Sequence, residues 1–445
     1  MKQVREVNLM NKTQAEDMQN RAKQTNSSRL ARVGIAIGVT LSVATMSGLS
    51  LAASHIIHAA KCVEKPAERL LQSPLDTLTE KPFVVHAVHA VHPIHFESGN
   101  LEHVLWQPEP LPARPEGAGK SAENNPLQNE LTAESEQAIA RGLAALARSQ
   151  EADGSFGGQG FGQKVAVTSL SCLALMADGN IPGRGAYGEV VRKGLEYVLT
   201  NSSETGLLAT QSTSNPMYGH GFAALFLGEI HGMTPGGADT ESADRLHRAL
   251  LRAVQLIERS QNDEGGWRYN PVAADADVSV TICQIMALRS ARNAGLEVSK
   301  GVIDRAVEYV RRLQNADGGF RYQMTQGPSA WPRSAAGVAS LYYAGIYEDR
   351  AIDTGLKYLI EMAMPGRAET QQIHFFYGHY YAVQAMFLAG GDNWAKWWPA
   401  IRDLLLREQN PNGRWEDASA GEQYGTAMAL IILQMPKRYL PIFQK

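Results

Sequence analysis

Residues 305–320 read RAVEYVRRLQNADGGF and decide the fold, because their closing motif, Gln-x-x-x-Gly-x-aromatic, occurs four times in the chain. The other copies are residues 150–156 (QEADGSF), 261–267 (QNDEGGW) and 409–415 (QNPNGRW). Self-similarity at a regular period is typical of folds in which one small structural unit is stacked repeatedly. The motif therefore predicts a repeat protein.

Two further units lack the motif but keep the sequence that precedes it. Residues 193–198 (KGLEYV) and 354–359 (TGLKYL) are similar to residues 305–310 (RAVEYV). One aliphatic position aligns all six units, with spacings of 52, 59, 53, 49 and 46 residues, so the units fill residues 131–445. The aligned residues are Leu146, Val198, Ile257, Val310, Leu359 and Leu405.

Each unit is predicted to contain two helices. In the first helix of one unit, Val302, Ala306 and Val310 recur at helical spacing and form one apolar face. A turn rich in Asn, Asp and Gly then ends that helix. The second helix is more apolar, and no stretch has the alternation of a strand. Six units without a polar capping repeat favour a closed ring over an open solenoid.

The extended pattern resembles the repeat of squalene cyclases and protein prenyltransferase β subunits, the prenyltransferase/squalene oxidase (terpene cyclase-like) repeat family. That pattern is [KR]-[GA]-x-x-aromatic-aliphatic-x-x-x-Gln-x-x-x-Gly-x-[FW]. Residues 305–320 match it throughout, and the copies that begin at Arg141 and Arg252 lack only its first aromatic residue. The resemblance covers about 310 of 445 residues. It implies an all-α (α/α)6 toroid of six helix pairs around a central cavity, in which the Gln and aromatic residues brace neighbouring outer helices.

The chain changes character twice before the repeats. Residues 1–32 are polar, with seven Lys or Arg against three Asp or Glu, and residues 33–60 contain none of these four types. Residues 33–53 are long enough to span a bilayer, and Arg29 and Arg32 place the N-terminus in the cytoplasm. We expect one uncleaved transmembrane anchor at residues 33–60, with a cleaved signal peptide as the alternative. Both place the repeats outside the cytoplasm.

Residues 61–130 contain nine of the chain's twenty prolines, which predicts a linker. Within it, His86, His89, His92 and His95 recur at a spacing of three. Short His-rich tracts can bind metal ions, but no Asp, Glu or Cys at ligand spacing accompanies these four. We favour an exposed repeat without a function over a metal site, and we predict no cofactor. The net charge of −3 gives no indication of a nucleic-acid partner.

The candidate site consists of the residues that open the second helices, which the resemblance places at one rim of the cavity. Units 2 and 5 open with Tyr-Gly-His, at residues 218–220 and 377–379. This similarity predicts a duplicated block of three units, so that His220 faces His379 across the ring. A ligand about 10 Å long, held at both ends, fits between helices roughly 16–20 Å apart. The alternative is a helix-start motif whose Tyr and His bind backbone groups.

The other units open with charged or aromatic residues. In the same twofold arrangement the Asp pair of unit 3 faces Glu422 of unit 6, and Lys164 of unit 1 faces Arg333 of unit 4. The candidate ligand-binding residues are Tyr218, His220, Trp331, Arg333, Tyr377, His379, Glu422 and Tyr424.

Asp275 and Asp277 are the candidate catalytic residues. The resemblance implies this role, because protonation-initiated terpene cyclases carry Asp-x-Asp-Asp at the corresponding helix start; the final Asp is Val278 here. An adjacent carboxylate and an apolar cavity both raise the pKa of a carboxyl group, which would keep one Asp protonated as a general acid. The alternative is an N-cap, in which the Asp accepts hydrogen bonds from the first helical amides.

These observations lead to two functional hypotheses. The first is a membrane-anchored, extracytoplasmic toroid that binds an apolar molecule such as an isoprenoid in its central cavity, with cyclase or mutase chemistry left open. The second is a non-catalytic interaction module that binds a peptide or an envelope protein through its rim. A continuous apolar cavity of several hundred Å³ would favour the first. A centre filled by side chains, together with exposed aromatic patches, would favour the second.

Overall fold

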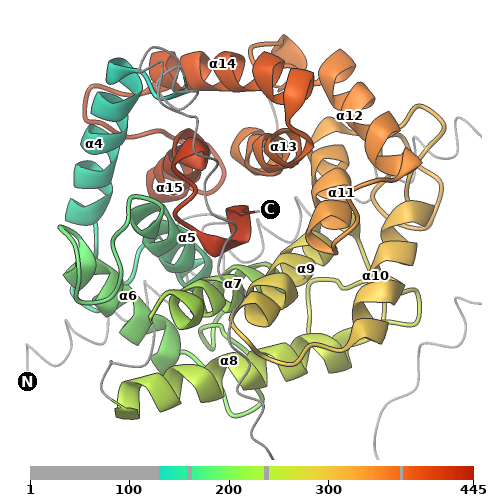
Figure 1. Ribbon diagram of the computed structural model, residues 1–445. Coiled ribbons are helices and arrows are strands. Elements are labelled where there is room, and N and C mark those ends of the chain that lie inside the picture. Colours follow the sequence, from blue (N-terminus) through green and yellow to red (C-terminus); the bar gives the residue numbers. More distant parts are fainter. Residues whose placement is uncertain (1–129, 158–162, 235–239, 371–373, 445) are drawn as a thin grey trace, which may run out of the picture. The chain divides into compact units, whose positions relative to one another are not determined.

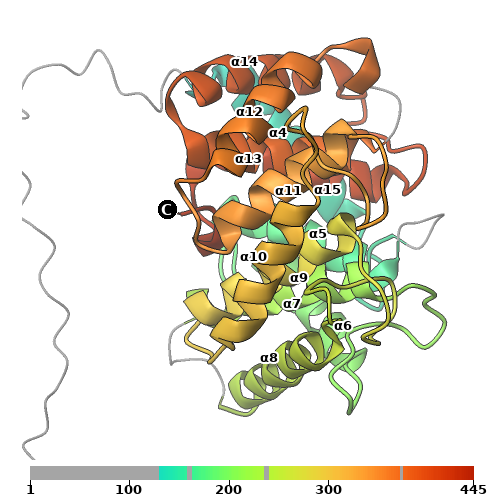
Figure 2. The same cartoon turned by 90° about the vertical axis from the view of Figure 1, so that its right-hand side faces the viewer.

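The computed structural model describes residues 130–444, except for residues 158–162, 235–239 and 371–373. In these described residues the regular structure is helical, and twelve α-helices alternate between an outer and an inner ring (Figure 1). Figure 2 views the same ring from the side of α10 and α12. The predicted all-α toroid of six helix pairs is therefore confirmed for this part of the chain.

Outer helices bury one side, and inner helices are buried on nearly all sides. The apolar face predicted for Val302, Ala306 and Val310 is buried on α10. The outer helices are α4 (Ala133–Arg148), α6 (Gly188–Thr200), α8 (Thr240–Ser260), α10 (Lys300–Arg312), α12 (Arg350–Met362) and α14 (Gly391–Glu408). The inner helices are α5 (Lys164–Met176), α7 (Met217–Met233), α9 (Val278–Asn293), α11 (Trp331–Tyr343), α13 (Phe375–Ala389) and α15 (Glu422–Leu433).

The repeated glutamine joins each turn to the next outer helix. Nε2 of Gln261 donates to the carbonyl of Gly265 in its own turn and to that of Val302 in α10, both at 2.8 Å. Gly265 has a φ of 98°, and a Cβ there would lie 2.2 Å from the Arg305 carbonyl oxygen, so only glycine fits. The same pair of bonds is made by Gln150, Gln314 and Gln409.

The aromatic residue of the motif fastens the turn to both helices of its unit. Trp267 is fully buried. Its backbone N–H donates to Oγ1 of Thr281 in the inner helix at 3.1 Å, and its indole N–H donates to the Ile257 carbonyl in the outer helix at 2.7 Å. The structural role predicted for the repeated residues is thus visible in the hydrogen bonds.

Unit 2 contains the same turn in a form that the sequence motif does not reveal. Gly206 has a φ of 89°, and a Cβ there would lie 2.2 Å from the Arg252 carbonyl oxygen, as in the motif turns. Leu208 takes the place of the aromatic residue and is fully buried. An aliphatic side chain therefore occupies the position at which the four motif copies have Phe or Trp.

The ring closes between the first and the last helix pair. Gln434, which follows α15, donates from Nε2 to the Ala174 carbonyl in α5 at 2.9 Å, and Lys437 forms an ion pair with Asp178. These contacts show that the repeat forms a closed ring rather than an open solenoid.

Side chains cross the centre of the ring. Phe222 of α7 contacts Tyr380 of α13, with 6.1 Å between ring centroids, although these helices belong to units 2 and 5 on opposite sides. Sγ of Cys283 in α9 lies 3.3 Å from the Tyr381 hydroxyl of α13. The middle of the ring is therefore packed with aromatic side chains at this level.

The C-terminal segment lies within the ring of helices (Figure 1) and contacts α9 and the part of α7 near its C-terminal end. It includes the 3-10 helix η3 (Pro441–Phe443), in which Ile442 and Phe443 are buried. The Ile442 N–H donates to Oε2 of Glu229, a buried residue of α7, at 3.0 Å. The segment thus packs against α7 and α9.

The predicted anchor at residues 33–60, the linker at residues 61–130 and its four histidines lie outside the described residues, apart from Glu130. Within the described part of the chain, no helix combines the length and the apolar character needed to cross a bilayer.

Candidate functional site

The first residues of the inner helices fall into two register positions. Because outer and inner helices alternate along the chain, all six inner helices begin at the same rim. One buried Ser, Thr or His in each points outward; for example, Thr281 accepts the Trp267 N–H, and Ser334 accepts the Phe320 N–H at 2.8 Å. A residue two positions earlier lies about 200° around the helix and points into the ring.

These inward-pointing residues form what we call the mouth, and all six are partly exposed. Three of the six are tyrosines, and one is a serine. The mouth consists of Ala166, Tyr218, Ser279, Pro332, Tyr377 and Tyr424.

Two tyrosines of the mouth converge on Ser279. The Tyr218 hydroxyl lies 2.7 Å from Oγ of Ser279, and the Tyr377 hydroxyl donates to its carbonyl at 3.1 Å. Loss of hydration raises the pKa of Tyr218, Tyr377 and Tyr424 far above the usual tyrosine range. The three tyrosine side chains are therefore partly exposed, while their hydroxyl groups lie in surroundings of low hydration.

Asp277 is the N-cap of α9, as the alternative interpretation predicted. Its Oδ1 accepts from the N–H groups of Ser279 and Val280, both at 2.9 Å, and from the Ser279 hydroxyl at 2.6 Å. Its Oδ2 accepts from the Tyr322 hydroxyl at 3.2 Å. Because Oδ1 is committed to the cap, only Oδ2 is available to carry a proton.

Burial raises the pKa of Asp277 above its usual range, although its hydrogen bonds and Arg268 oppose that shift. The neighbouring carboxylate is not the cause, contrary to the sequence-based expectation. Asp275 is exposed and forms an ion pair with Arg268, whose Nε lies 3.7 Å from Oδ2 of Asp277. A guanidinium therefore lies beside both carboxylates, and the two Asp residues have different environments.

Sequence reasoning missed three residues that complete this site. Arg268 lies over the rings of Tyr269 and Tyr322, with 4.9 and 5.8 Å from Cζ to the centroids, and the two tyrosine hydroxyls are hydrogen-bonded to each other. A signal was present in the sequence. The dipeptide Arg-Tyr follows the aromatic residue of the motif in two copies, at residues 268–269 and 321–322.

The two histidines of the Tyr-Gly-His motifs point away from the mouth, so the expectation that His220 faces His379 is wrong. Nδ1 of His220 accepts from the Leu208 N–H at 3.2 Å, as Ser and Thr do in other units. His379 is fully buried against Trp331 and Trp397, with centroids 4.8 and 5.9 Å away. The helix-start interpretation therefore describes His220, and neither histidine lines the mouth.

The charged rim residues bind within their own units. Arg333 donates to the carbonyls of Phe320 at 3.2 Å and Pro328 at 2.8 Å. Glu422 forms an ion pair with Arg414 at 2.8 Å. Lys164 and Asp275 form ion pairs with Glu151 and Arg268. The residues expected to face each other across the ring, the Asp pair with Glu422 and Lys164 with Arg333, therefore make their polar contacts within their own units.

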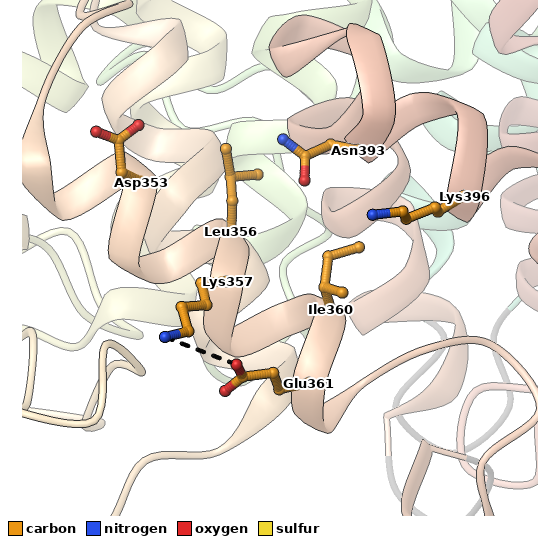
Figure 3. A pocket seen from close by; sticks show the side chains of 7 residues that line it. All are labelled: Asp353, Leu356, Lys357, Ile360, Glu361, Asn393 and Lys396. Carbon is orange, nitrogen blue, oxygen red and sulfur yellow. Dashed lines mark ion pairs between the residues drawn. The ribbon is translucent and has the colours of Figure 1, made fainter.

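Among the described residues, no group of three potential ligands could hold a metal ion. Two pockets of these residues are lined by none of the mouth residues. One, of about 350 Å³, is bordered by the C-terminal segment. The other, of about 300 Å³, is a groove between two outer helices (Figure 3). It is lined by Asp353, Leu356, Lys357, Ile360 and Glu361 of α12 and by Asn393 and Lys396 of α14.

Comparison with known sequences gives one informative similarity. The chain is 27% identical over 194 residues to drimenyl diphosphate synthase of Streptomyces showdoensis. The match covers 43% of this chain and 33% of that protein, so the chain spans about a third of the length of the relative. No protein-family model matches the chain.

Solved structures share the fold. The α-1,6-mannanase GH76A of Salegentibacter sp. HEL1_6 superimposes with a TM-score of 0.50 at 10% identity, covering 68% of this chain and 99% of that one. The type II terpene cyclase MstE from Scytonema gives a TM-score of 0.48 at 16% identity, covering 69% and 99%. The mannanase confirms the α/α toroid and shows that this fold does not determine chemistry. The sequence similarity to drimenyl diphosphate synthase confirms the predicted resemblance to terpene cyclase-like repeat proteins.

Proposed function

We propose that the protein binds an apolar, isoprenoid-type molecule at the mouth of its ring. The observation that carries this proposal is the cluster of mouth tyrosines, Tyr218, Tyr377 and Tyr424, beside Ser279, whose hydroxyl bonds the buried carboxyl of Asp277. Aromatic walls with few polar groups are typical of sites for apolar ligands. The similarity to a protein named as a drimenyl diphosphate synthase supports an isoprenoid.

The same geometry defines what cyclase chemistry would require. Oδ2 of Asp277 would transfer its proton to a carbon–carbon double bond, leaving a carboxylate on the protein and a carbocation on the ligand. The faces of the mouth tyrosines would stabilise that cation, and Arg268 would stabilise the carboxylate. Because Oδ2 is covered by Tyr322 and Arg268, both side chains would have to move first.

Replacing Asp277 separates acid catalysis from helix capping. Asp277→Asn is expected to leave stability nearly unchanged, because Asn caps helices about as well as Asp, whereas Asp277→Ala should cost about 0.5–2 kcal/mol. If Asp277 is the acid, any product formed from linear polyprenyl substrates by the wild type disappears in Asp277→Asn. Absence of product from the wild type across such a panel would remove the cyclase chemistry and leave binding.

Binding is tested by filling the mouth. Ala166 is its smallest residue, so Ala166→Trp should abolish copurification of a lipid, measured by native mass spectrometry, without changing the melting temperature. Ala140→Trp, at an exposed position of α4, is the matched control. Equal lipid content in both variants would place the ligand elsewhere.

A second function is favoured by the packed centre of the ring. The contact between Phe222 and Tyr380 leaves less room than a continuous cavity requires, and the groove in Figure 3 offers an outer surface with Leu356 and Ile360 among charged residues. A non-catalytic module that binds a peptide or an envelope protein would fit these features. Absence of any copurified lipid, with normal melting, would favour this alternative.

We also propose that the toroid lies outside the cytoplasm on a membrane tether, as residues 33–60 indicate. Protease added to spheroplasts should then degrade the repeats. A cytoplasmic marker protein must stay intact in the same sample. Full protection of the repeats in intact spheroplasts, with degradation after lysis, would contradict the topology.

A further inference from the structure

We propose that His231 and His247 form a binding site for one divalent transition-metal ion of the zinc or copper class. His231 belongs to the last turn of α7, and His247 lies in α8, so the site would join the inner helix of unit 2 to the outer helix of unit 3. Nε2 of His231 lies 3.2 Å from Nδ1 of His247, and the ring centroids are 5.3 Å apart. One nitrogen of each ring is thus directed at the ring of the neighbouring helix.

The separation of the two nitrogens suits a shared metal ion. Imidazole nitrogens bind Zn²⁺ at about 2.0–2.1 Å in tetrahedral geometry, which places two such ligands about 3.3–3.4 Å apart. The observed distance of 3.2 Å is close to this separation, and the rings would rotate so that both nitrogen lone pairs point at the ion instead of at each other. His247 is exposed and His231 is half-buried, so an ion and its water ligands can reach the pair from solvent.

The donor set determines which ions the site would accept. Imidazole suits zinc, copper and nickel, whereas calcium and magnesium prefer oxygen ligands. Since the described residues supply no group of three potential ligands, water would complete the coordination. The alternative is a plain hydrogen bond between two neutral imidazoles, which needs no ion.

Unfolding of the full chain tests the proposal, because an ion that binds only the folded state stabilises it. At a free Zn²⁺ concentration one hundred times the dissociation constant, the ratio of folded to unfolded protein should rise about a hundredfold, and Mg²⁺ should have no effect. His247→Ala should abolish the rise. His374→Ala, at another exposed histidine, should keep it. Replacing the linker histidines His86, His89, His92 and His95 by Ala should leave the rise unchanged.

Zinc that also binds the unfolded chain would reduce the stabilisation, so a second measurement follows the two histidines in the folded protein. Diethylpyrocarbonate modifies accessible histidines, and mass spectrometry locates the products. Zn²⁺ should protect His247 but not His374. If zinc protects neither residue and His247→Ala melts with the same zinc response as the wild type, the pair is a hydrogen bond only and the proposal is overturned.

Discussion

Trp267→Ala is expected to lower the free energy of unfolding by about 3–5 kcal/mol, the range for truncation of a large buried aromatic residue. The side chain is fully buried, and its indole N–H bonds the outer helix of its unit. Trp415→Ala should have a matching effect, because Trp415 bonds the Leu405 carbonyl at 2.8 Å in the same way. Urea unfolding followed by circular dichroism measures both changes.

The control for this pair is Tyr439→Ala. Tyr439 is 53% exposed and should change stability by no more than about 0.5 kcal/mol. Neither tryptophan lines the mouth, so ligand binding by the folded fraction should be unchanged. Loss of binding at normal stability would show that the motif aromatic belongs to a functional site and that its structural assignment is wrong.

Acidification from pH 7 to pH 4 is expected to destabilise the toroid by about 3 kcal/mol through each of two buried histidines. Burial lowers the pKa of His220 to about 4 and that of His379 to about 3. In the unfolded chain both groups bind a proton below about pH 6.5. The unfolded state therefore gains protons first as the pH falls, and stability is lost between about pH 6.5 and pH 4.

Replacing each histidine by phenylalanine separates this effect from that of other titrating groups. Neither ring nitrogen of His379 has a partner among the described residues, so His379→Phe should change stability at pH 7 by less than about 1.5 kcal/mol. The same variant should lose about 3 kcal/mol less than the wild type on acidification, which is the contribution of His379 alone. His220→Phe should cost about 1–3 kcal/mol at pH 7, because the Leu208 N–H loses its acceptor. An undiminished acid loss in His379→Phe would contradict the prediction.

The fold could be predicted because its defining residues act locally. Gln261 and Gly265 bond within one turn and to the next outer helix, so four copies of the motif indicate four equivalent turns. The equivalent turn of unit 2 escaped detection because Leu208 and His220 replace the aromatic and hydroxyl residues. Only the backbone conformation shows that this turn is the same.

The site was less predictable, because sequence register does not show which face of a helix points inward. The N-cap role of Asp277, the alternative to a catalytic role, follows from its position alone, and the hydrogen bonds confirm it. His220 and His379 were assigned to the wrong face. Packing across the ring, such as that of Phe222 on Tyr380, depends on side chains from opposite helices and has no local signature.

Synthesis of the chain imposes a delay on the closure of the ring. Gln434 and Ile442 bind Ala174 and Glu229, yet the ribosome makes them 260 and 213 residues later. Translation proceeds at about 5–20 residues per second, so roughly ten seconds to a minute pass between the synthesis of α5 and α7 and that of these partners. During that interval the nascent protein exposes surface that favours aggregation and chaperone binding. A transcript interrupted before codon 434 would yield a toroid that lacks the contacts of Gln434 and Ile442, and proteases would distinguish it from the finished one.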